Sequence, residues 1–450
     1  MGAASLTRQL AQQLVVDRER GLPSAAVGIA PTYVLDWLGS LLAGTATAAG
    51  DMLIEHARQR PEAATSILGT ALRRSPEVAA FVNGGLSHIV EMDDLHRASV
   101  LHPGAVVIPA ALAAAQTVDA SARDFLEAVV VGYEVAIRVG EAVGKRHYHY
   151  FHNTATCGVF GAAAAAGWLL NLDADQWVWA FGNAGTQACG LWEFNADGAM
   201  SKHLHAGRAA AAGLVSAELG GRGFTGASQI LEGERGFFAA TAPDAEPQRV
   251  VDGLDSWTDH PRIAGVSIKP HSSCRHTHAG IDAALDLRPQ IVGEQLDAIE
   301  IGTYQAALDL CDNPEPADPY TAKFSLQYCI AAALAYGHVS PGDFSAESIA
   351  DPAVRSLLAN VSVYVDPEFE ALYPRQWPVQ LRLRSTQGGS WDRHVSSPKG
   401  DPENPLSYGE LEAKFRQLAS SGVHQLHANG LLQWVLSLDA GGTLTPPRAA

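Results

Sequence analysis

The chain has 450 residues, a length that suits two or three domains. Its residues are 47% hydrophobic, which is typical of a folded protein with a large core. Asp and Glu number 48 against 31 Lys and Arg, so the formal net charge is −17. We therefore expect neither nucleic acid nor a membrane surface as a partner.

Cysteine usage and the N-terminal residues bear on the compartment. The five cysteines are widely spaced and form no C-x-x-C pair, which argues against a zinc ribbon, an iron–sulfur cluster or a disulfide framework. The first thirteen residues lack the basic start and apolar core of a signal peptide. The apolar stretch 26–44 contains Pro31 and Asp36 and favours a buried helix over a membrane span. We expect a cytoplasmic protein.

The N-terminal part of the chain, to about Gly236, has the pattern of helices. Apolar residues recur at helical spacing over 34–42, and Pro31 lies where a helix can begin. Further helices are predicted over 125–143 and 161–172. The second of these is rich in Ala and Gly, which lets a neighbouring helix approach closely.

After about Val251 the pattern becomes mixed. Alternation predicts strands over 296–304, 360–365, 379–384 and 391–395, with helices over 279–287 and 324–336. Beyond a proline-containing connector at 397–407, helices are predicted over 410–418 and 423–438. The fold class is therefore mainly α. Both chain ends, 1–265 and 397–450, form a large helical domain, and 266–396 form a smaller inserted α+β domain.

Histidines and lysines are concentrated in a few short segments. Twelve of the 17 histidines lie between His88 and His278, and the chain has only six lysines. Two of those lysines fall inside histidine-rich segments: Lys202 precedes His203 and His205, and Lys269 lies in the segment 269–278. This coincidence predicts a site for an anionic substrate.

The first histidine-rich segment runs from His88 to Gly104 and includes Glu91, Asp93, Asp94 and His102. A histidine can take or give a proton near neutral pH, and a nearby carboxylate can fix its tautomer. The alternative interpretation is an acidic, solvated turn.

The second segment, 147–156, precedes the alanine-rich helix. Thr154 and Thr156 are candidate caps of that helix, whose N-terminus would then favour an anionic group, and we favour His152 as a functional residue over His147 and His149. The alternative is an aromatic loop with exposed histidines.

The lysine-containing segments allow two interpretations. Lys202, Lys269 and Arg275 suit a substrate with several carboxylates. The pairs His203-x-His205 and His276-x-His278 suit a metal, but no H-E-x-x-H motif accompanies them and the adjacent cations oppose one. No G-x-G-x-x-G motif follows a predicted strand, and no P-loop or G-x-S-x-G motif appears in the sequence.

In this order the segments resemble the MmgE/PrpD family. The matching stretches cover nearly the whole chain: E-M-D-D-L-H and V-L-H-P-G (91–104), H-N-T-A-T-C-G (152–158), A-G-T-Q-A-C-G-L (184–191), S-K-H-L-H-A-G-R-A-A (201–210), R-G-F-T-G (222–226), S-I-K-P-H-S-S-C-R-H-T-H (267–278), A-K-F-S-L-Q-Y (322–328) and P-K-G-D-P-E-N-P-L (398–406).

The resemblance implies a helical domain with an α+β lid, a homodimer, and no metal or organic cofactor. The catalytic positions it implies are Asp93, His102, His152, Lys202 and Lys269. The substrate-binding positions that we expect are Glu91, Asp94, Arg275 and His276.

The sequence departs from the family's common pattern at several positions. Glu91 stands where Asp is usual, Leu95 where Thr or Ser is usual, and 271–272 where an aromatic is common. The decarboxylases carry a tyrosine near the region of Leu310, and Tyr304 is the nearest tyrosine in this chain. These changes bear on the substrate more than on the chemistry.

The leading hypothesis is a hydro-lyase acting on a small hydroxy-carboxylic acid. His102 or His152 would remove the proton alpha to a carboxylate, and Lys202 and Lys269 would stabilise the resulting charge. The same groups suit decarboxylation of an aconitate-like acid, or epimerisation of a dicarboxylate such as iminodisuccinate. A binding protein without catalytic activity is the alternative from another class.

Overall fold

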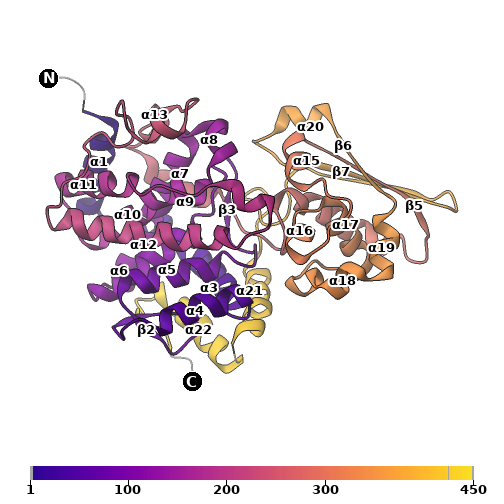
Figure 1. Cartoon of the computed structure of the whole chain (residues 1–450), viewed down its shortest axis with the longest axis horizontal. Coiled ribbons are helices and arrows are strands. Elements are labelled where there is room, and N and C mark those ends of the chain that lie inside the picture. Colours follow the sequence, from indigo (N-terminus) through magenta and orange to yellow (C-terminus); the bar gives the residue numbers. More distant parts are fainter. Residues whose placement is uncertain (1–3, 424, 448–450) are drawn as a thin grey trace. The chain divides into compact units, whose positions relative to one another are not determined.

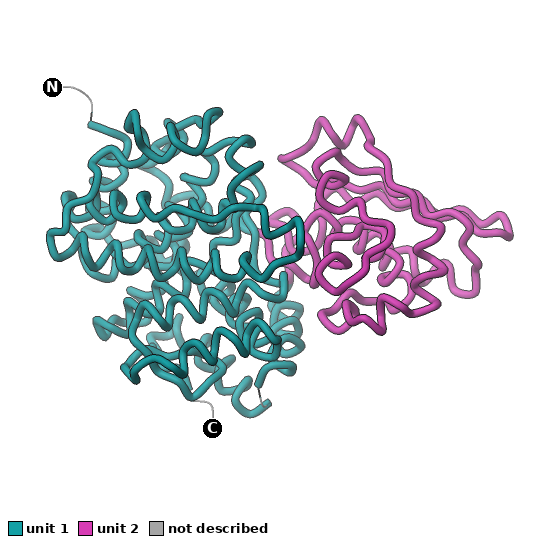
Figure 2. The backbone as a smooth tube through the Cα atoms, in the orientation of Figure 1, with its two compact units in different colours: residues 1–266, 407–450 teal, residues 267–406 magenta. Residues whose placement is uncertain are grey.

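The structure is a computed structural model of the chain, and it describes residues 4–423 and 425–447. The chain divides into two compact units (Figure 2). Unit 1 comprises residues 1–266 and 407–450, and unit 2 comprises residues 267–406. The described part is mainly helical, which confirms the predicted fold class (Figure 1).

Unit 1 is built almost wholly from helices. Its elements are α1 (Leu6–Arg20), α2 (Ser24–Val27), α3 (Ala30–Gly44), α4 (Ala48–Arg58), β1 (Thr65–Ser66), β2 (Arg73–Arg74), α5 (Pro76–Ser87), β3 (Leu95–His96), α6 (Gly104–Thr117), α7 (Ala122–Ala142), α8 (Gly144–Tyr150), α9 (Asn153–Thr156), α10 (Gly158–Leu169), α11 (Ala174–Gly185), α12 (Ser201–Gly221), α13 (Phe237–Thr241), α21 (Tyr408–Gly422) and α22 (Gln425–Leu438).

Both ends of the chain contribute to unit 1, and α21 packs against α3. Lys414 on α21 is buried and forms an ion pair with Asp36 on α3. Its Nζ also donates to the backbone oxygen of Met92 at 2.7 Å. The C-terminal segment therefore supports the segment that follows α5.

Close helix packing in unit 1 depends on small residues. A Cβ on Gly161 of α10 would lie 2.6 Å from both the Gly132 oxygen and the Ala136 Cβ on α7. Real atoms do not approach so closely, so a larger residue would push the two helices apart. This confirms the expected role of the Ala- and Gly-rich helix.

One stretch of the described chain, Ser24–Gly44, is long and apolar enough to cross a membrane by composition. In the structure it contains α2 and α3, and 72% of its most apolar window is buried inside the protein. This burial is typical of a core helix.

Unit 2 combines helices with a four-stranded sheet. Its elements are α14 (His278–Leu287), β5 (Leu296–Thr303), α15 (Gln305–Cys311), α16 (Pro319–Lys323), α17 (Leu326–Tyr336), α18 (Ala346–Ala350), α19 (Pro352–Leu358), β6 (Val361–Val365), α20 (Pro367–Leu372), β7 (Val379–Ser385) and β8 (Ser390–Val395), and β4 (Val266–Ser267) lies where the two units join.

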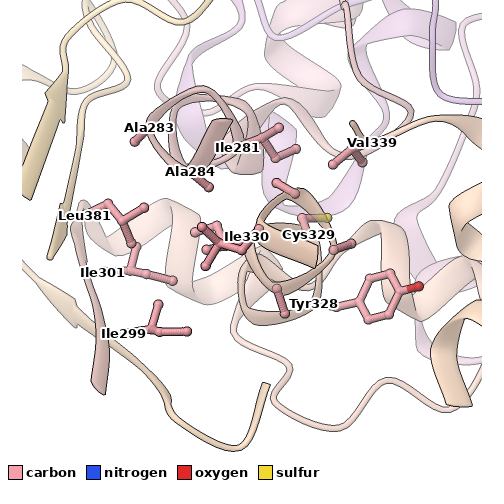
Figure 3. Close-up of a cluster of buried hydrophobic side chains, with 14 of the residues drawn as sticks. Ile281, Ala283, Ala284, Ile299, Ile301, Tyr328, Cys329, Ile330, Val339 and Leu381 are labelled. Carbon is pink, nitrogen blue, oxygen red and sulfur yellow. The ribbon is translucent and has the colours of Figure 1, made fainter. Parts of the chain in front are cut away.

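The sheet has the strand order β6-β5-β7-β8, with β5 and β6 parallel and the other pairs antiparallel. All four predicted strands are confirmed. On β7, Val379, Leu381 and Leu383 are buried, whereas the residues between them are less so. The buried face packs against α14 and α17. Ile330 of α17 points toward Ile301 and Leu381, and Ile281 of α14 belongs to the same buried cluster (Figure 3).

Unit 2 ends at residue 406, beyond the expected boundary at 396. The connector belongs to this unit because its backbone is bonded there: Arg275 donates to the Lys399 oxygen at 3.0 Å, and Ile268 donates to the Gly400 oxygen at 2.8 Å. Gly400 has a φ of +89°, and a Cβ there would collide with the Ile268 oxygen. These contacts between the connector and residues 268–275 cannot be predicted from sequence periodicity, so the expected boundary lies too early in the chain.

Candidate active site

Two histidines and a carboxylate meet in the segment between α5 and α6. His88 caps the C-terminus of α5, and His102 lies shortly before α6. Asp93 Oδ2 is 2.6 Å from His88 Nδ1 and 3.3 Å from His102 Nδ1. All three side chains are buried, which excludes the acidic solvated turn.

Asp93 is ionised in this setting. Burial alone would raise the pKa of Asp93, but the charges and hydrogen bonds of His88 and His102 hold it well below its usual value. An ionised carboxylate beside an imidazole orients the ring and favours its protonated form. His102 therefore directs Nδ1 toward Asp93.

Two buried polar atoms in this group stand out. Within residues 4–423 and 425–447, neither Asp93 Oδ1 nor His88 Nε2 has a hydrogen-bond partner. Buried polar atoms without a protein partner are expected where a ligand or water supplies the hydrogen bond.

Asp94 faces in another direction and holds the loop to the helices. Its carboxylate accepts a hydrogen bond from Tyr133 Oη at 2.6 Å and one from the Gly104 N–H at 3.0 Å. Burial and the nearby charges of Asp36 and Asp93 raise the pKa of Asp94 well above its usual value. These contacts favour an anchoring role, and its expected contact with substrate stays a prediction.

His152 is placed by the start of α9. Its backbone N–H donates to the Gly190 oxygen at 3.0 Å. Its ring stacks on His88 with 5.4 Å between centroids and lies 4.9 Å from Trp192. Burial lowers the pKa of His152 well below its usual value, and the neighbouring histidines and Lys202 add to the shift. A neutral imidazole of this kind can accept a proton at neutral pH.

The expected threonine caps were wrong. The residues 153–156 form a separate short helix, α9, and neither threonine caps α9 or α10. Thr154 Oγ1 instead accepts from the His102 N–H at 3.1 Å, and Thr156 Oγ1 is 2.8 Å from His147 Nε2. Both hydroxyls therefore contact residues of other segments, and such contacts cannot be predicted from a local capping pattern.

Lys202 lies in the first turn of α12 and forms a buried ion pair with Glu91. Glu91 has a φ of +61°, a left-handed conformation that is uncommon for a residue with a side chain. The two predicted residues are therefore brought together, although 111 positions separate them.

Sequence reasoning did not select His88 and His205 as site residues. His205 Nδ1 lies 3.3 Å from His152 Nδ1, and His88 contacts both Asp93 and His152. The spacing from Lys202 to His205 is three residues, which places both on one face of a helix. That spacing was a usable signal for His205.

Unit 2 holds a second group of predicted residues. Lys269 is 1% exposed. Burial of the His276 ring, together with the nearby charge of Lys269, lowers the pKa of His276 to about 3. His276 Nδ1 is 2.7 Å from Tyr304 Oη, and its ring stacks on Trp377 with 4.2 Å between centroids. Tyr304, the tyrosine nearest to the expected position, is thus in contact with a predicted site residue.

Arg275 is engaged inside unit 2. Its guanidinium forms a buried ion pair with Asp401 and donates to the Lys399 oxygen. It also lies 2.8 Å from His278 Nδ1. These contacts favour a role in holding the connector, and the predicted substrate contact of Arg275 stays untested.

Among the described residues, His88, Asp93 and His102 form one group of three that could hold a metal, with their ligand atoms within 4.8 Å of one another. Two ligand atoms of a tetrahedral zinc ion lie about 3.3 Å apart, given bond lengths of about 2.0–2.1 Å. The 2.6 Å between His88 Nδ1 and Asp93 Oδ2 suits a direct hydrogen bond better than a shared ion.

Known proteins resemble this chain over most of its length. A cis-aconitate decarboxylase-like protein, oryM, of Aspergillus oryzae is 29% identical over 86% of this chain and 84% of its own length. The human cis-aconitate decarboxylase is 29% identical over 90% of this chain and 86% of its own. The 2-methylcitrate dehydratase of Salmonella typhimurium is 26% identical over 22% of each chain.

Two family models match the chain, one in each part. The model of the MmgE/PrpD N-terminal domain matches residues 8–250, and that of the C-terminal domain matches residues 271–439. The first range contains His102, His152 and Lys202, and the second begins two residues after Lys269. The chain belongs to the MmgE/PrpD family.

Proposed function

We propose that the protein is a cofactor-independent lyase that acts on a small acid with more than one carboxylate. The observation that carries the proposal is that two histidines of unit 1, each in ring contact with His88, have unlike surroundings. His152 is neutral, whereas His102 is held against the ionised Asp93. Titratable groups whose environments differ in this way suit the separate roles of base and acid.

In the proposed dehydration, His152 removes the proton alpha to a carboxylate. Lys202 binds that carboxylate and stabilises the charge that develops on it, and Lys269 supplies a second positive charge. His102, supported by Asp93, then protonates the leaving hydroxyl, which departs as water. Glu91 sets how much of the Lys202 charge is available to the substrate, because the two side chains form an ion pair.

Decarboxylation is the second candidate, and a specific observation favours it. The relatives that match over most of this chain carry the name cis-aconitate decarboxylase, whereas the dehydratase matches over 22% of the chain. Loss of CO₂ leaves a carbanion next to a carboxylate, the same charge distribution that dehydration passes through. The lysines would stabilise it, and a histidine would deliver a proton to carbon. Epimerisation needs the same carbanion and two proton-transfer groups.

The proposal extends to the assembly and setting of the protein. We propose a cytoplasmic homodimer in which unit 2 acts as the lid that the family resemblance implies. The dimer and the lid are supported by the family membership, and a reducing compartment is supported by five widely spaced cysteines that form no C-x-x-C pair.

The test is incubation of the protein in D₂O with citrate-like, aconitate-like and aminosuccinate-like acids, followed by NMR. Water loss, CO₂ loss and isotope exchange without net change identify the three reactions. His152→Asn and Lys202→Met should each lower turnover by about 10²-fold or more. A panel with no turnover and no exchange would contradict the lyase and favour the binding protein.

A further inference from the structure

The base proposed above is buried and touches a second histidine. His152 is 2% exposed, so its ring has little access to solvent. His205 on α12 is half-buried, and its Nδ1 is 3.3 Å from the Nδ1 of His152. The two rings therefore form a path from an enclosed nitrogen to a more open one.

A contact between two imidazole Nδ1 atoms requires one proton between them. A neutral imidazole has one N–H donor and one acceptor nitrogen, so one ring donates from Nδ1 and the other accepts. Burial lowers the pKa of His205 to about 4, and the charges of His88 and Lys202 contribute. Both rings of the pair are thus neutral at neutral pH, which is the state that allows a single shared proton.

We propose that His205 relays protons between His152 and solvent. This inference rests on the proposed function, in which His152 takes a proton from the substrate and must later release it. His205 acts through His152 and does not itself meet the substrate, so it is a positioning and relay residue.

The pair has two tautomeric arrangements that interconvert with balanced protons. In the first, His152 Nδ1–H donates to His205 Nδ1, and His152 Nε2 has a lone pair. When Nε2 takes a proton from the substrate carbon, the Nδ1 proton passes to His205, and His205 Nε2–H releases a proton to water. The second arrangement has His152 Nε2–H and returns by the reverse path, which delivers a proton from water to a carbanion.

Neighbouring residues restrict the positions of the His152 and His205 rings. Phe194 packs edge-on against His205 with 5.4 Å between centroids, and Trp192 lies 4.9 Å from the His152 ring. Gly190 has a φ of +145°, and a Cβ on it would lie 3.3 Å from His205 Nδ1 and 2.8 Å from the Ala155 Cβ. A larger residue at position 190 would therefore crowd the relay.

The test compares His205→Asn and His205→Ala with the wild type, on the acid that the wild type converts. Asn places a hydrogen-bonding atom where Nδ1 was but cannot pass a proton on. A relay predicts that both variants lose about 10- to 10²-fold in kcat, with KM changed by less than about twofold. Exchange of the substrate C–H with D₂O should slow in the same proportion, and added imidazole should restore part of the rate in His205→Ala. His149→Asn, at an exposed histidine of the same unit, is the matched control.

Three results would overturn the relay. One is wild-type kcat and exchange in both variants. Another is full activity in His205→Asn with loss only in His205→Ala, which would mean that His205 merely orients His152. The third needs no variant: a relay moves two protons at once and gives a curved dependence of kcat on the D₂O fraction, so a linear dependence would contradict it. Absence of turnover in the wild type would instead refute the proposed function.

Discussion

Lys202 and Glu91 form an ion pair in which both side chains are 4% exposed. Glu91 adopts its left-handed backbone conformation where this contact is made. The pair joins the segment after α5 to the first turn of α12. A charge pair at this depth affects both folding and the charge that a substrate meets.

Replacing Glu91 by Gln should lower the free energy of unfolding by about 3–5 kcal/mol, because it leaves a buried ammonium without this carboxylate. Urea denaturation measures the change. The matched control is Glu55→Gln, which removes the exposed pair between Glu55 and Arg58 and should cost less than about 1 kcal/mol. Equal losses in the free energy of unfolding would show that the buried ion pair contributes no more to stability than the exposed one.

The double variant Glu91→Gln with Lys202→Met should be more stable than the sum of the single changes predicts, because neither charge is then left buried alone. In activity assays, Glu91→Gln should change KM, since the Lys202 charge becomes more available to a substrate carboxylate. If the stability changes of the two substitutions simply add in the double variant and KM is unchanged in Glu91→Gln, then the ion pair neither couples the two residues nor affects the substrate.

The neighbouring carboxylates Asp93 and Asp94 should respond oppositely to the same substitution. The pKa of Asp93 is held low, so the carboxylate is charged and supports His102; Asp93→Asn should lower kcat by about 10²-fold or more. The pKa of Asp94 is raised, so Asp94→Asn resembles the protonated native residue and should retain most activity. Steady-state kinetics of the two variants on one substrate provide the comparison.

The same two residues make opposite contributions to stability as pH changes. Asp93 stabilises the fold above its ordinary pKa of 3.8, and this contribution is lost as pH falls through the lower native value. Asp94 costs stability above 3.8, because its unfolded form ionises more readily, and the cost diminishes as pH falls. Relative to Asp94→Asn, the wild type should therefore gain stability on going from pH 7 to pH 4. A constant difference would show that Asp94 is ionised in the native protein.

His152 should stay neutral while an unfolded chain titrates. Its native pKa lies well below the ordinary value of 6.5, so the unfolded chain takes up a proton first as pH falls. The wild type should lose stability relative to His152→Asn below pH 6.5. Histidine ring NMR, with the denatured protein as reference, tests the same point directly. Titration of the native His152 ring near 6.5 would remove the basis for its role as a neutral base.

Gly190→Ala should lower activity more than the same substitution at a glycine with a positive φ away from the candidate site. The new Cβ would crowd His205 and Ala155, whereas a Cβ on Gly253, with a φ of +60°, meets nothing within 4 Å. The backbone cost of Ala is about 1 kcal/mol at Gly253 and larger at Gly190, whose φ of +145° lies outside the left-handed helical region. Comparison of kcat and Tm for Gly190→Ala and Gly253→Ala separates crowding of the site from backbone strain.

Much of the fold could be predicted from local pattern. The alternation in 379–384 reports one buried face of a strand, and β7 has that face. The alanines and glycines of α10 report a close helix contact, and α7 provides it. These features depend on residues near one another in sequence, where periodicity is informative.

The site was predictable in part. Local chemistry and family resemblance indicated Asp93, His102, His152 and Lys202, which lie in one group in unit 1. The contact between His152 and His205 was not predicted, because it depends on how α9 meets α12, which no local spacing encodes. Thr156 was misassigned for the same reason, since its hydroxyl is 2.8 Å from His147 Nε2.

The bond from Lys414 to the Met92 oxygen has a consequence for how the protein is made. Met92 precedes Asp93, so the lysine that holds this segment of the candidate site comes from a helix translated after all of unit 2. A nascent chain that stops before residue 414 carries the segment without this support. The candidate site therefore reaches its final form only near the end of synthesis, and a C-terminal truncation before α21 should abolish the proposed activity while leaving every proposed site residue in the chain.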